Sequence, residues 1–356
     1  MPVMRIVVTG ATGNVGSALL PQLLAEPQVT SVVGLARRLP PEPDPRAEWH
    51  ALDVAEDDLV PVLSGADVVV HLAWLLQPAH DPDEMWRVNI RGTRRVLDAI
   101  ATAGVPALVH ASSVGAYSAG PKTPAVAESH PTYGISTSAY SRHKAEAERM
   151  LDVFEAEHPE RRVVRMRPGI VLQASAGSEI ARYFLGPLVP QSLARRSLLP
   201  FVPDVRGIAI QAVHASDMAT AYRLGCLRPV TGAFNIAAEP VLDPASLAAI
   251  LGARRLRLPA AALRALVALT WRMHLQPTDP GWVDIALRTP LLDTSRARTE
   301  FGWQPTVDAA QTLLELLHGM ASGQGGDSPV LRPRASGPGR VLEVVRALVP
   351  GVRGAG

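Results

Sequence analysis

The chain has 356 residues, of which 47% are hydrophobic and 19% charged, and its formal net charge is only +2. This composition is typical of a globular protein with a large core, and the low net charge argues against nucleic acid or a membrane surface as a partner. Cys226 is the only cysteine, which excludes a disulfide within the chain and fits a reducing compartment. The ten histidines lack the close spacing of a metal site, and no apolar run reaches the roughly 18 residues of a membrane span. We therefore expect a soluble, cytoplasmic protein without a bound metal.

The first 170 residues alternate short apolar runs with helical stretches. The runs lack strict polar–apolar alternation, as strands buried on both faces do. They lie at Arg5 to Thr9, Ser31 to Leu35, Val68 to Leu72, Ala107 to Ser112 and Arg162 to Met166. Helices are expected at Val15 to Ala25, Glu84 to Ala103 and Ala139 to His158. This order predicts an α/β fold: a doubly wound parallel sheet with helices on both faces.

The pattern changes after Pro168. A strand and a helix are expected within Gln211 to Leu227, a short strand at Phe234 to Ala237, and an apolar helix near 260–273. We expect a sheet domain over residues 1–173, to which 207–240 returns. Residues 174–206 and 241–318 would form a smaller, mostly helical substrate lobe. Residues 319–356, rich in Gly, Ser and Pro at their start, would form a flexible tail.

A glycine-rich turn joins the first expected strand to the first expected helix. Gly10, Gly13 and Gly16 have the spacing of a dinucleotide-binding turn, in which they permit a tight turn, the approach of a pyrophosphate and close helix packing. Thr12, Asn14 and Val15 complete the turn, and the helix start offers free N–H groups to phosphates. A glycine turn without a ligand is the alternative. Its position at the first strand–helix junction favours a Rossmann fold that binds NAD or NADP.

The end of the second expected strand bears on the choice of dinucleotide. An NAD-specific site places a carboxylate there for the ribose 2′-hydroxyl, whereas this chain has Arg37 and Arg38. Two guanidiniums can pair with a 2′-phosphate, so NADP is favoured over NAD. The alternative is that both arginines belong to a solvated loop.

A second motif lies on the helix expected from Ala139. Tyr140 and Lys144 are four residues apart, so the phenol and the ammonium project from one face. A cation about 4 Å away would lower the phenol pKa by up to about three units, which suits an acid/base at neutral pH. Only two of the 35 Lys and Arg residues are lysines, Lys122 and Lys144, which favours a required ammonium over a surface pair. Ser112 and Ser113 end the fourth strand, where a hydroxyl can hold a substrate oxygen beside the phenol.

Together these residues resemble the extended short-chain dehydrogenase/reductase family, the NAD(P)-dependent epimerase/dehydratase family, from Val3 to about residue 310. The resemblance implies that Ser113, which precedes Val114-Gly115-Ala116-Tyr117, orients the substrate, with Ser112 as the fallback. It also implies cofactor contacts that the glycine turn and the helix do not supply, at Asp53 and Val54, Leu72 and Ala73, Asn89, and Pro168. The sequence after Pro168 departs from the family pattern, so the substrate side is left open.

The resemblance implies an NAD(P)-dependent oxidoreductase that transfers a hydride between the nicotinamide and a carbonyl or alcohol carbon of a small molecule. Tyr140 would be the acid/base, Lys144 would hold the nicotinamide ribose, and the chain would form a homodimer. Apolar Trp74-Leu75-Leu76 beside the site favours an apolar substrate. One alternative is a sugar-nucleotide epimerase or dehydratase that recycles its cofactor and binds a diphosphate through arginines, for which the candidates are Arg182, Arg195, Arg196 and Arg206. A non-catalytic NADPH-binding sensor is the second alternative.

Overall fold

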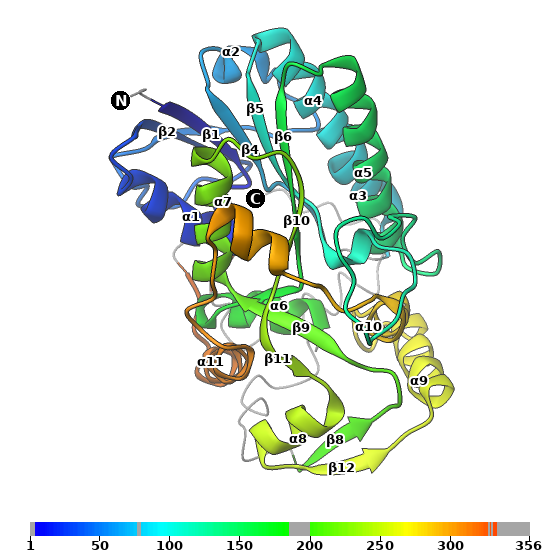
Figure 1. Cartoon of the computed structure of the whole chain (residues 1–356). Coiled ribbons are helices and arrows are strands. Elements are labelled where there is room, and N and C mark those ends of the chain that lie inside the picture. Colours follow the sequence, from blue (N-terminus) through cyan, green and yellow to red (C-terminus); the bar gives the residue numbers. More distant parts are fainter. Residues whose placement is uncertain (1–3, 77–79, 185–199, 327, 329, 333–356) are drawn as a thin grey trace.

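The computed structural model describes residues 4–76, 80–184, 200–326, 328 and 330–332. A seven-stranded sheet with the order β10-β6-β5-β4-β1-β2-β3 forms its centre (Figure 1). Its strands are β1 (Met4–Thr9), β2 (Val29–Ala36), β3 (Glu48–Ala51), β4 (Val68–His71), β5 (Ala107–Ala111), β6 (Arg162–Pro168) and β10 (Gly232–Ile236). Every pairing in it is parallel. The strand order reverses between β1 and β4, and a crevice for a ligand is expected at the carboxyl ends beside such a reversal.

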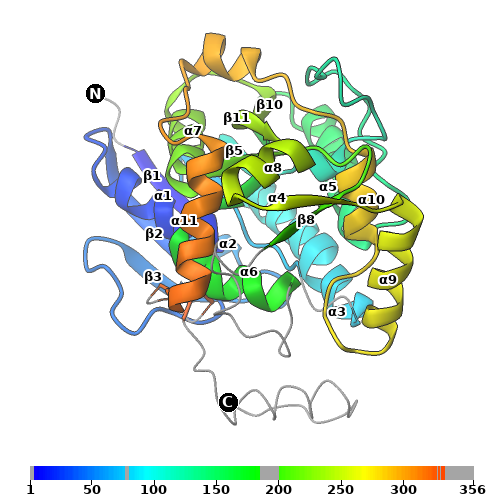
Figure 2. The same cartoon turned by 90° about the horizontal axis from the view of Figure 1, so that it is seen from below.

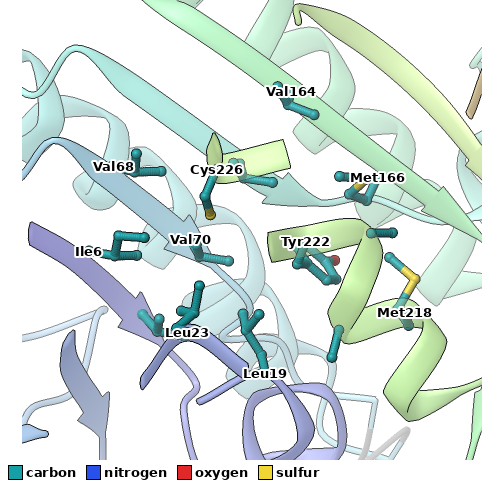
Figure 3. Close-up of a cluster of buried hydrophobic side chains, with 14 of the residues drawn as sticks. Ile6, Leu19, Leu23, Val68, Val70, Val164, Met166, Met218, Tyr222 and Cys226 are labelled. Carbon is teal, nitrogen blue, oxygen red and sulfur yellow. The ribbon is translucent and has the colours of Figure 1, made fainter. Parts of the chain in front are cut away.

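Helices cover both faces of this sheet because alternate residues of each strand point to opposite faces. On one face, Ile6 and Val8 of β1 pack with helices α1 (Asn14–Leu24) and α7 (Ala215–Leu227). Figure 3 shows this cluster, in which Leu19 and Leu23 of α1 and Met218, Tyr222 and Cys226 of α7 lie around the strand residues. On the other face, Val7 packs with α2 (Val60–Leu63), α4 (Gly92–Ala103) and α5 (Ala139–Glu157). Each buried aliphatic side chain contributes about 1.5–3 kcal/mol.

The predicted fold class, a doubly wound parallel sheet, is confirmed. The five expected strands correspond to β1, β2, β4, β5 and β6. β3 was not predicted, because it is a four-residue edge strand whose residues are exposed or half-buried and therefore lacks an apolar run. The helix expected at Glu84 to Ala103 is divided into α3 (Pro82–Trp86), a π-helical turn (Arg87–Arg91) and α4.

Two small sheets lie outside the central one. β7 (Ile170–Leu172), β9 (Ile210–His214) and β11 (Ala238–Leu242) form a three-stranded sheet, and β8 (Phe201–Asp204) pairs with β12 (Arg254–Arg257). Residues 207–240 were expected to return to the first domain, and they do so only in part. α7 and β10 pack in the main body, whereas β9 pairs with β7 and β11. The described residues form five further α-helices: α6 (Gly177–Phe184), α8 (Pro244–Leu251), α9 (Ala260–Arg272), α10 (Gly281–Arg288) and α11 (Ala309–Ser322). Figure 2 shows α8, α9 and α10 from below.

The chain beyond residue 318 differs in part from the expected flexible tail. Helix α11 continues to Ser322, and Leu331 is buried, with its carbonyl accepting a hydrogen bond from the Gly326 N–H. The tail prediction for 333–356 lies outside the described residues. Within the described part of the chain, no helix is long and apolar enough to cross a membrane.

Helix α11 packs closely on the residues before α6 through Gly319. A Cβ added to Gly319 would lie 2.3 Å from the Ala174 carbonyl oxygen, and neither backbone can yield easily. We predict that Gly319→Ala lowers the free energy of unfolding by about 1–3 kcal/mol, the usual cost of overpacking. Chemical unfolding followed by circular dichroism measures this change. His318→Ala, at the exposed neighbouring position, is the control and is expected to change stability by less than about 0.5 kcal/mol. Equal stability of the two variants would contradict the close packing.

Candidate active site

A cavity of about 860 Å³ opens at the carboxyl ends of β1, β2, β3, β4, β5 and β6. Its lining contains every predicted cofactor and catalytic residue except Asn89. These residues are Gly10, Thr12, Gly13, Asn14, Val15, Gly16, Arg37, Arg38, Asp53, Val54, Leu72, Ala73, Ser113, Tyr140, Lys144 and Pro168. The fold thus brings together residues from six strand ends and from helix α5 that are far apart in the sequence. Their roles remain predictions.

The glycine-rich turn forms one end of the cavity. Gly10 has a φ of +70°, and a Cβ there would lie 2.7 Å from the Ala73 nitrogen, so any other residue would displace the loop after β4. A Cβ on Gly16 would lie 2.6 Å from the Ala11 oxygen. Gly13 is the N-cap of α1, and no side chain of the described residues caps it. The first N–H groups of α1 are consequently available to an anion, as the predicted binding of a pyrophosphate at this turn requires.

Asn14 ties this turn to the second sheet. Its amide nitrogen donates to the Val171 oxygen at 2.9 Å, and Gln173 Nε2 donates to the Asn14 Oδ1 at 2.9 Å. The side chain therefore fixes the start of α1 against β7 as well as lining the cavity.

The residues after β2 and β3 form the rim beside the glycine turn, because β2 and β3 follow β1 in the sheet and the Ala11 N–H donates to the Leu35 carbonyl. Arg37 and Arg38 are both exposed, and Arg37 Nη1 is 3.9 Å from the Glu84 carboxylate. Asp53 is engaged by Arg87, whose Nη2 is 3.3 Å from Asp53 Oδ2. Arg38 forms no ion pair with the described residues. At least one guanidinium is thus free to meet an anion at the end of β2.

Tyr140 lies in apolar and aromatic surroundings. Its ring stacks on Trp282 with a centroid distance of 4.8 Å and meets the edge of Trp74 at 6.5 Å. Burial raises the pKa of Tyr140 to about 12, while a hydrogen bond with the Ser113 side chain opposes this shift. The phenol is therefore protonated at neutral pH.

Lys144 does not act on the phenol as the sequence predicted. Its ammonium donates to the Ala111 carbonyl at 2.6 Å and lies 3.4 Å from the centroid of the Trp74 ring, but 6.0 Å from that of Tyr140. Burial lowers the pKa of Lys144 to about 7, with Glu148 opposing the shift. The expected lowering of the Tyr140 pKa is thus wrong for the protein alone, because desolvation raises the pKa of the phenol.

The structure distinguishes the two candidate serines. Ser113 Oγ accepts a hydrogen bond from the Gly115 N–H at 3.0 Å and also reaches the Tyr140 phenol. Ser112 instead donates its hydroxyl proton to the buried carboxylate of Glu148. Both serines line the cavity, but the Ser112 hydroxyl is occupied by Glu148, which favours the prediction that Ser113 contacts the substrate.

Asn89 is outside the cavity lining and supports it from behind. Its side chain donates to the Leu75 carbonyl at 2.9 Å and accepts from the Leu75 N–H at 2.7 Å. The residue lies in the π-helical turn, a feature often found at functional sites. Asn89 thus fixes the Trp74–Leu75 loop, and its contact with a cofactor stays a prediction.

Sequence reasoning missed the aromatic wall opposite the glycine turn. Trp282 of α10 stacks on Tyr140, and Phe184 of α6 meets Trp282 edge-on with a centroid distance of 5.2 Å. Neither residue stands at a fixed spacing from a recognised motif, so the sequence carried no indication of their position. Among the described residues, no group of three His, Cys, Asp or Glu side chains could hold a metal ion.

Comparisons with known proteins add to what the geometry shows. An uncharacterized protein of Mycobacterium tuberculosis is 27% identical over 313 residues, which is 87% of this chain but 29% of that protein. The chain thus spans less than a third of the length of this relative. L-arabinose 1-dehydrogenase (NAD(P)(+)) of Haloferax volcanii is 36% identical over 110 residues, 31% of this chain and 41% of that one.

Solved structures share the fold. UDP-glucuronic acid 4-epimerase from Bacillus cereus, in complex with UDP-glucuronic acid and NAD, is 20% identical with a TM-score of 0.66 over 90% of this chain and 99% of that one. UDP-glucose 4-epimerase from Thermotoga maritima, with UDP-glucose, is 19% identical with a TM-score of 0.68 over 90% and 99%. The model of the NAD dependent epimerase/dehydratase family matches residues 6–237, more than half of the chain. The protein therefore belongs to the NAD-dependent epimerase/dehydratase family, of the extended short-chain dehydrogenase/reductase type.

Proposed function

We propose that the protein is an NADP-dependent oxidoreductase that interconverts an apolar ketone and its alcohol, with Tyr140 as the acid/base. The proposal is carried by one observation: a single cavity contains the glycine-rich turn, the Tyr140 phenol and an apolar wall. That wall comes from the later part of the chain and consists of Phe184, Ile208, Leu263, Trp282, Val283, Ile285 and Leu291. Family membership supports the use of NAD or NADP.

The cations near the cavity favour an apolar substrate over a sugar nucleotide. Arg37 and Arg38 follow β2, at the dinucleotide end. Arg182 lines the cavity, but its Nη2 donates to the Val330 carbonyl. Arg206 is exposed and outside the lining, while Arg195 and Arg196 lie outside the described residues. A diphosphate therefore has few candidate partners among the described residues on the apolar side.

The sugar-nucleotide epimerase remains the second candidate, because the similar structures named above include two UDP-sugar 4-epimerases. An epimerase recycles its cofactor and is expected to retain it through purification. The ultraviolet spectrum of the purified protein tests this. A non-catalytic NADPH sensor is a weaker candidate, since Tyr140, Lys144 and Ser113 all line one cavity.

The proposed chemistry divides between cofactor and protein. The chemistry that a bound nicotinamide supplies is hydride exchange with the substrate carbon. Tyr140 exchanges a proton with the substrate oxygen, and Ser113 holds that oxygen beside the phenol. Because burial raises the pKa of Tyr140 to about 12, the phenol is present at neutral pH as a proton donor, the form that ketone reduction requires. Lys144 and the first N–H groups of α1 would hold the nicotinamide ribose and the pyrophosphate.

The first test is a titration with NADP and NAD, followed by a panel of apolar ketones and alcohols monitored at the absorbance of reduced nicotinamide. Binding of NADP and turnover of at least one ketone are expected. Absence of binding by either dinucleotide would overturn the proposal.

We predict that Tyr140→Phe lowers turnover by about 10²–10⁴-fold, the usual contribution of an acid/base group. The ring and its stacking on Trp282 persist, so dinucleotide affinity should change little. Turnover is measured by absorbance and affinity by calorimetry. Tyr133→Phe is the control, because Tyr133 is 78% exposed and its hydroxyl is remote from the chemistry proposed. Comparable turnover of the two variants would exclude Tyr140 as the acid/base.

The arginines after β2 generate a prediction about cofactor choice. Replacing Arg37 or Arg38 with Ala removes a charge-assisted contact to a 2′-phosphate, so the Kd for NADP should rise about tenfold. The Kd for NAD, which lacks this phosphate, should change less than about twofold. Calorimetric titration of both dinucleotides measures the two values, with Arg94→Ala, an exposed arginine of α4, as the control. A loss of affinity that is equal for NADP and NAD would argue against recognition of the 2′-phosphate.

A further inference from the structure

A buried carboxylate that the proposed chemistry does not use lies one helical turn beyond Lys144. Glu148 of α5 has an exposed fraction of 0%. Burial alone would raise the pKa of Glu148, but hydrogen bonds and charges from Arg167, Arg165 and Ser112 outweigh burial and hold the pKa at about 2. Glu148 is therefore a charged group inside the core.

The two oxygens of this carboxylate join three segments. From β6, Arg167 donates through Nε to Oε1 at 2.8 Å and through Nη2 to Oε2 at 2.8 Å, and Arg165 Nη1 donates to Oε2 at 2.9 Å. From the end of β5, Ser112 donates its hydroxyl proton to Oε1. Glu148 itself belongs to α5, the helix of Tyr140 and Lys144.

Two of the joined segments carry a residue of the candidate site directly beside the contact, and in α5 Lys144 lies one helical turn before Glu148. Ser112 precedes Ser113, which reaches the phenol. Arg167 precedes Pro168, which lines the cavity. A displacement of Glu148 would therefore be transmitted to Ser113 and to Pro168 through a single peptide bond in each case.

Arg167 is itself fixed by further partners. Its Nη1 donates to the Tyr117 hydroxyl at 3.1 Å and to the Glu128 carbonyl at 2.8 Å, and the Tyr117 hydroxyl donates to Asn235 Oδ1 at 2.7 Å. Buried networks in which every group is satisfied make a structure rigid. Stability alone is a weak reason for such a network, because apolar residues of similar volume often replace buried ion pairs without loss.

We propose that Glu148 is a positioning residue, which fixes Ser113, Lys144 and Pro168 relative to one another through its buried carboxylate. This proposal rests on the proposed function, which gives Ser113, Lys144 and Pro168 their roles. The contacts of Glu148 do not depend on that function. Glu148 does not itself line the cavity, so it acts through Ser112, which does line it, and through Arg167 and the shared helix.

The charge of Glu148 also acts on Lys144, because residues four apart share a helix face. The other titratable groups that face Lys144 are His71 on β4, His110 on β5, and Tyr140 and His143 on α5. Burial lowers the pKa of each of the three histidines, to about 3 for His71 and about 4 for His143, and so they are neutral at neutral pH. Glu148 thus supplies a negative charge that favours the ammonium form of Lys144.

The composition of the chain permits a direct measurement. Because Lys122 and Lys144 are the only lysines, protein labelled with ¹³C at the lysine ε-carbon gives two NMR signals that can be titrated separately. In Glu148→Gln, the Lys144 signal is expected to titrate about one pH unit lower than in the unmodified protein. Lys122, which donates to the carbonyls of Ala209, Ala286 and Thr289, should titrate unchanged.

Glu155→Gln is the matched control. Glu155 lies on the same helix and pairs with Arg165 of β6, but it has no hydrogen bond to Ser112 or Arg167. The proposal expects Glu155→Gln to leave the Lys144 titration and turnover near their original values, and Glu148→Gln to lower turnover by about tenfold or more without a comparable loss of NADP affinity. It is overturned if Glu148→Gln leaves the Lys144 titration and turnover unchanged, or if Glu155→Gln has equal effects.

A second variant and the choice of dinucleotide-free protein ensure that the experiment gives a clear result. If Glu148→Gln does not fold, the double variant Glu148→Gln/Arg165→Gln balances the buried charge, and it is titrated against Arg165→Gln alone with the same expected difference. The titration uses protein without dinucleotide. Failure of the unmodified protein to bind NADP or NAD would therefore sink the proposed function, while the titration would still test the role of Glu148 separately.

Discussion

The attachment of helix α5 to the carboxyl ends of β5 and β6 is the contact on which the candidate site depends. Polar bonds in buried surroundings make this attachment: Lys144 donates to the Ala111 carbonyl, and Ser141 donates its hydroxyl proton to the Gly115 carbonyl and accepts from the Ile135 N–H. A buried polar group without a partner costs about 1–3 kcal/mol. A shift of the helix along the strands would break several such bonds together, so the helix is held in one register.

The burial that fixes α5 also sets the charge states at the site. It raises the pKa of Tyr140 to about 12 and lowers that of Lys144 to about 7, so each group is pushed toward its neutral form. Perturbation of this kind in a cavity is typical of functional residues. The protein alone therefore offers a proton donor beside an ammonium that is easily neutralised. Glu148 is important in this balance because its charge opposes the loss of the Lys144 proton.

The predictable part of the fold is the part that buries both faces of a sheet. β1, β2, β4, β5 and β6 are apolar runs, and their order with the intervening helices was sufficient to predict the parallel sheet. β3 has the sequence Glu-Trp-His-Ala and lies at the edge of the sheet, where its residues are exposed or half-buried. It therefore lacks the apolar run that indicates a buried strand. The second sheet of β7, β9 and β11 depends on pairing between distant segments, which periodicity cannot reveal.

The candidate site was predictable where it follows from spacing along the chain. The glycine turn and the Tyr140–Lys144 pair fall into this class, whereas the stacking of Trp282 on Tyr140 depends on how α10 is placed. The effect of Lys144 on the phenol was overestimated, because a Coulomb energy for an assumed separation of about 4 Å ignores desolvation and the competing Ala111 carbonyl. The arginines at 165 and 167, which alternate within a buried strand, were an available indication of a buried anion.

The two lysines of this arginine-rich chain lie where a compact ammonium is required. Lys122 donates to the carbonyls of Ala209, Ala286 and Thr289, and two of these acceptors are at the end of α10. An ammonium has three donors that can diverge toward three carbonyls, whereas the planar fork of a guanidinium cannot. The positive charge also favours the carboxyl end of the helix dipole. Since α10 carries Trp282, Lys122 holds the wall that faces Tyr140 from one side, while Lys144 holds α5 from the other.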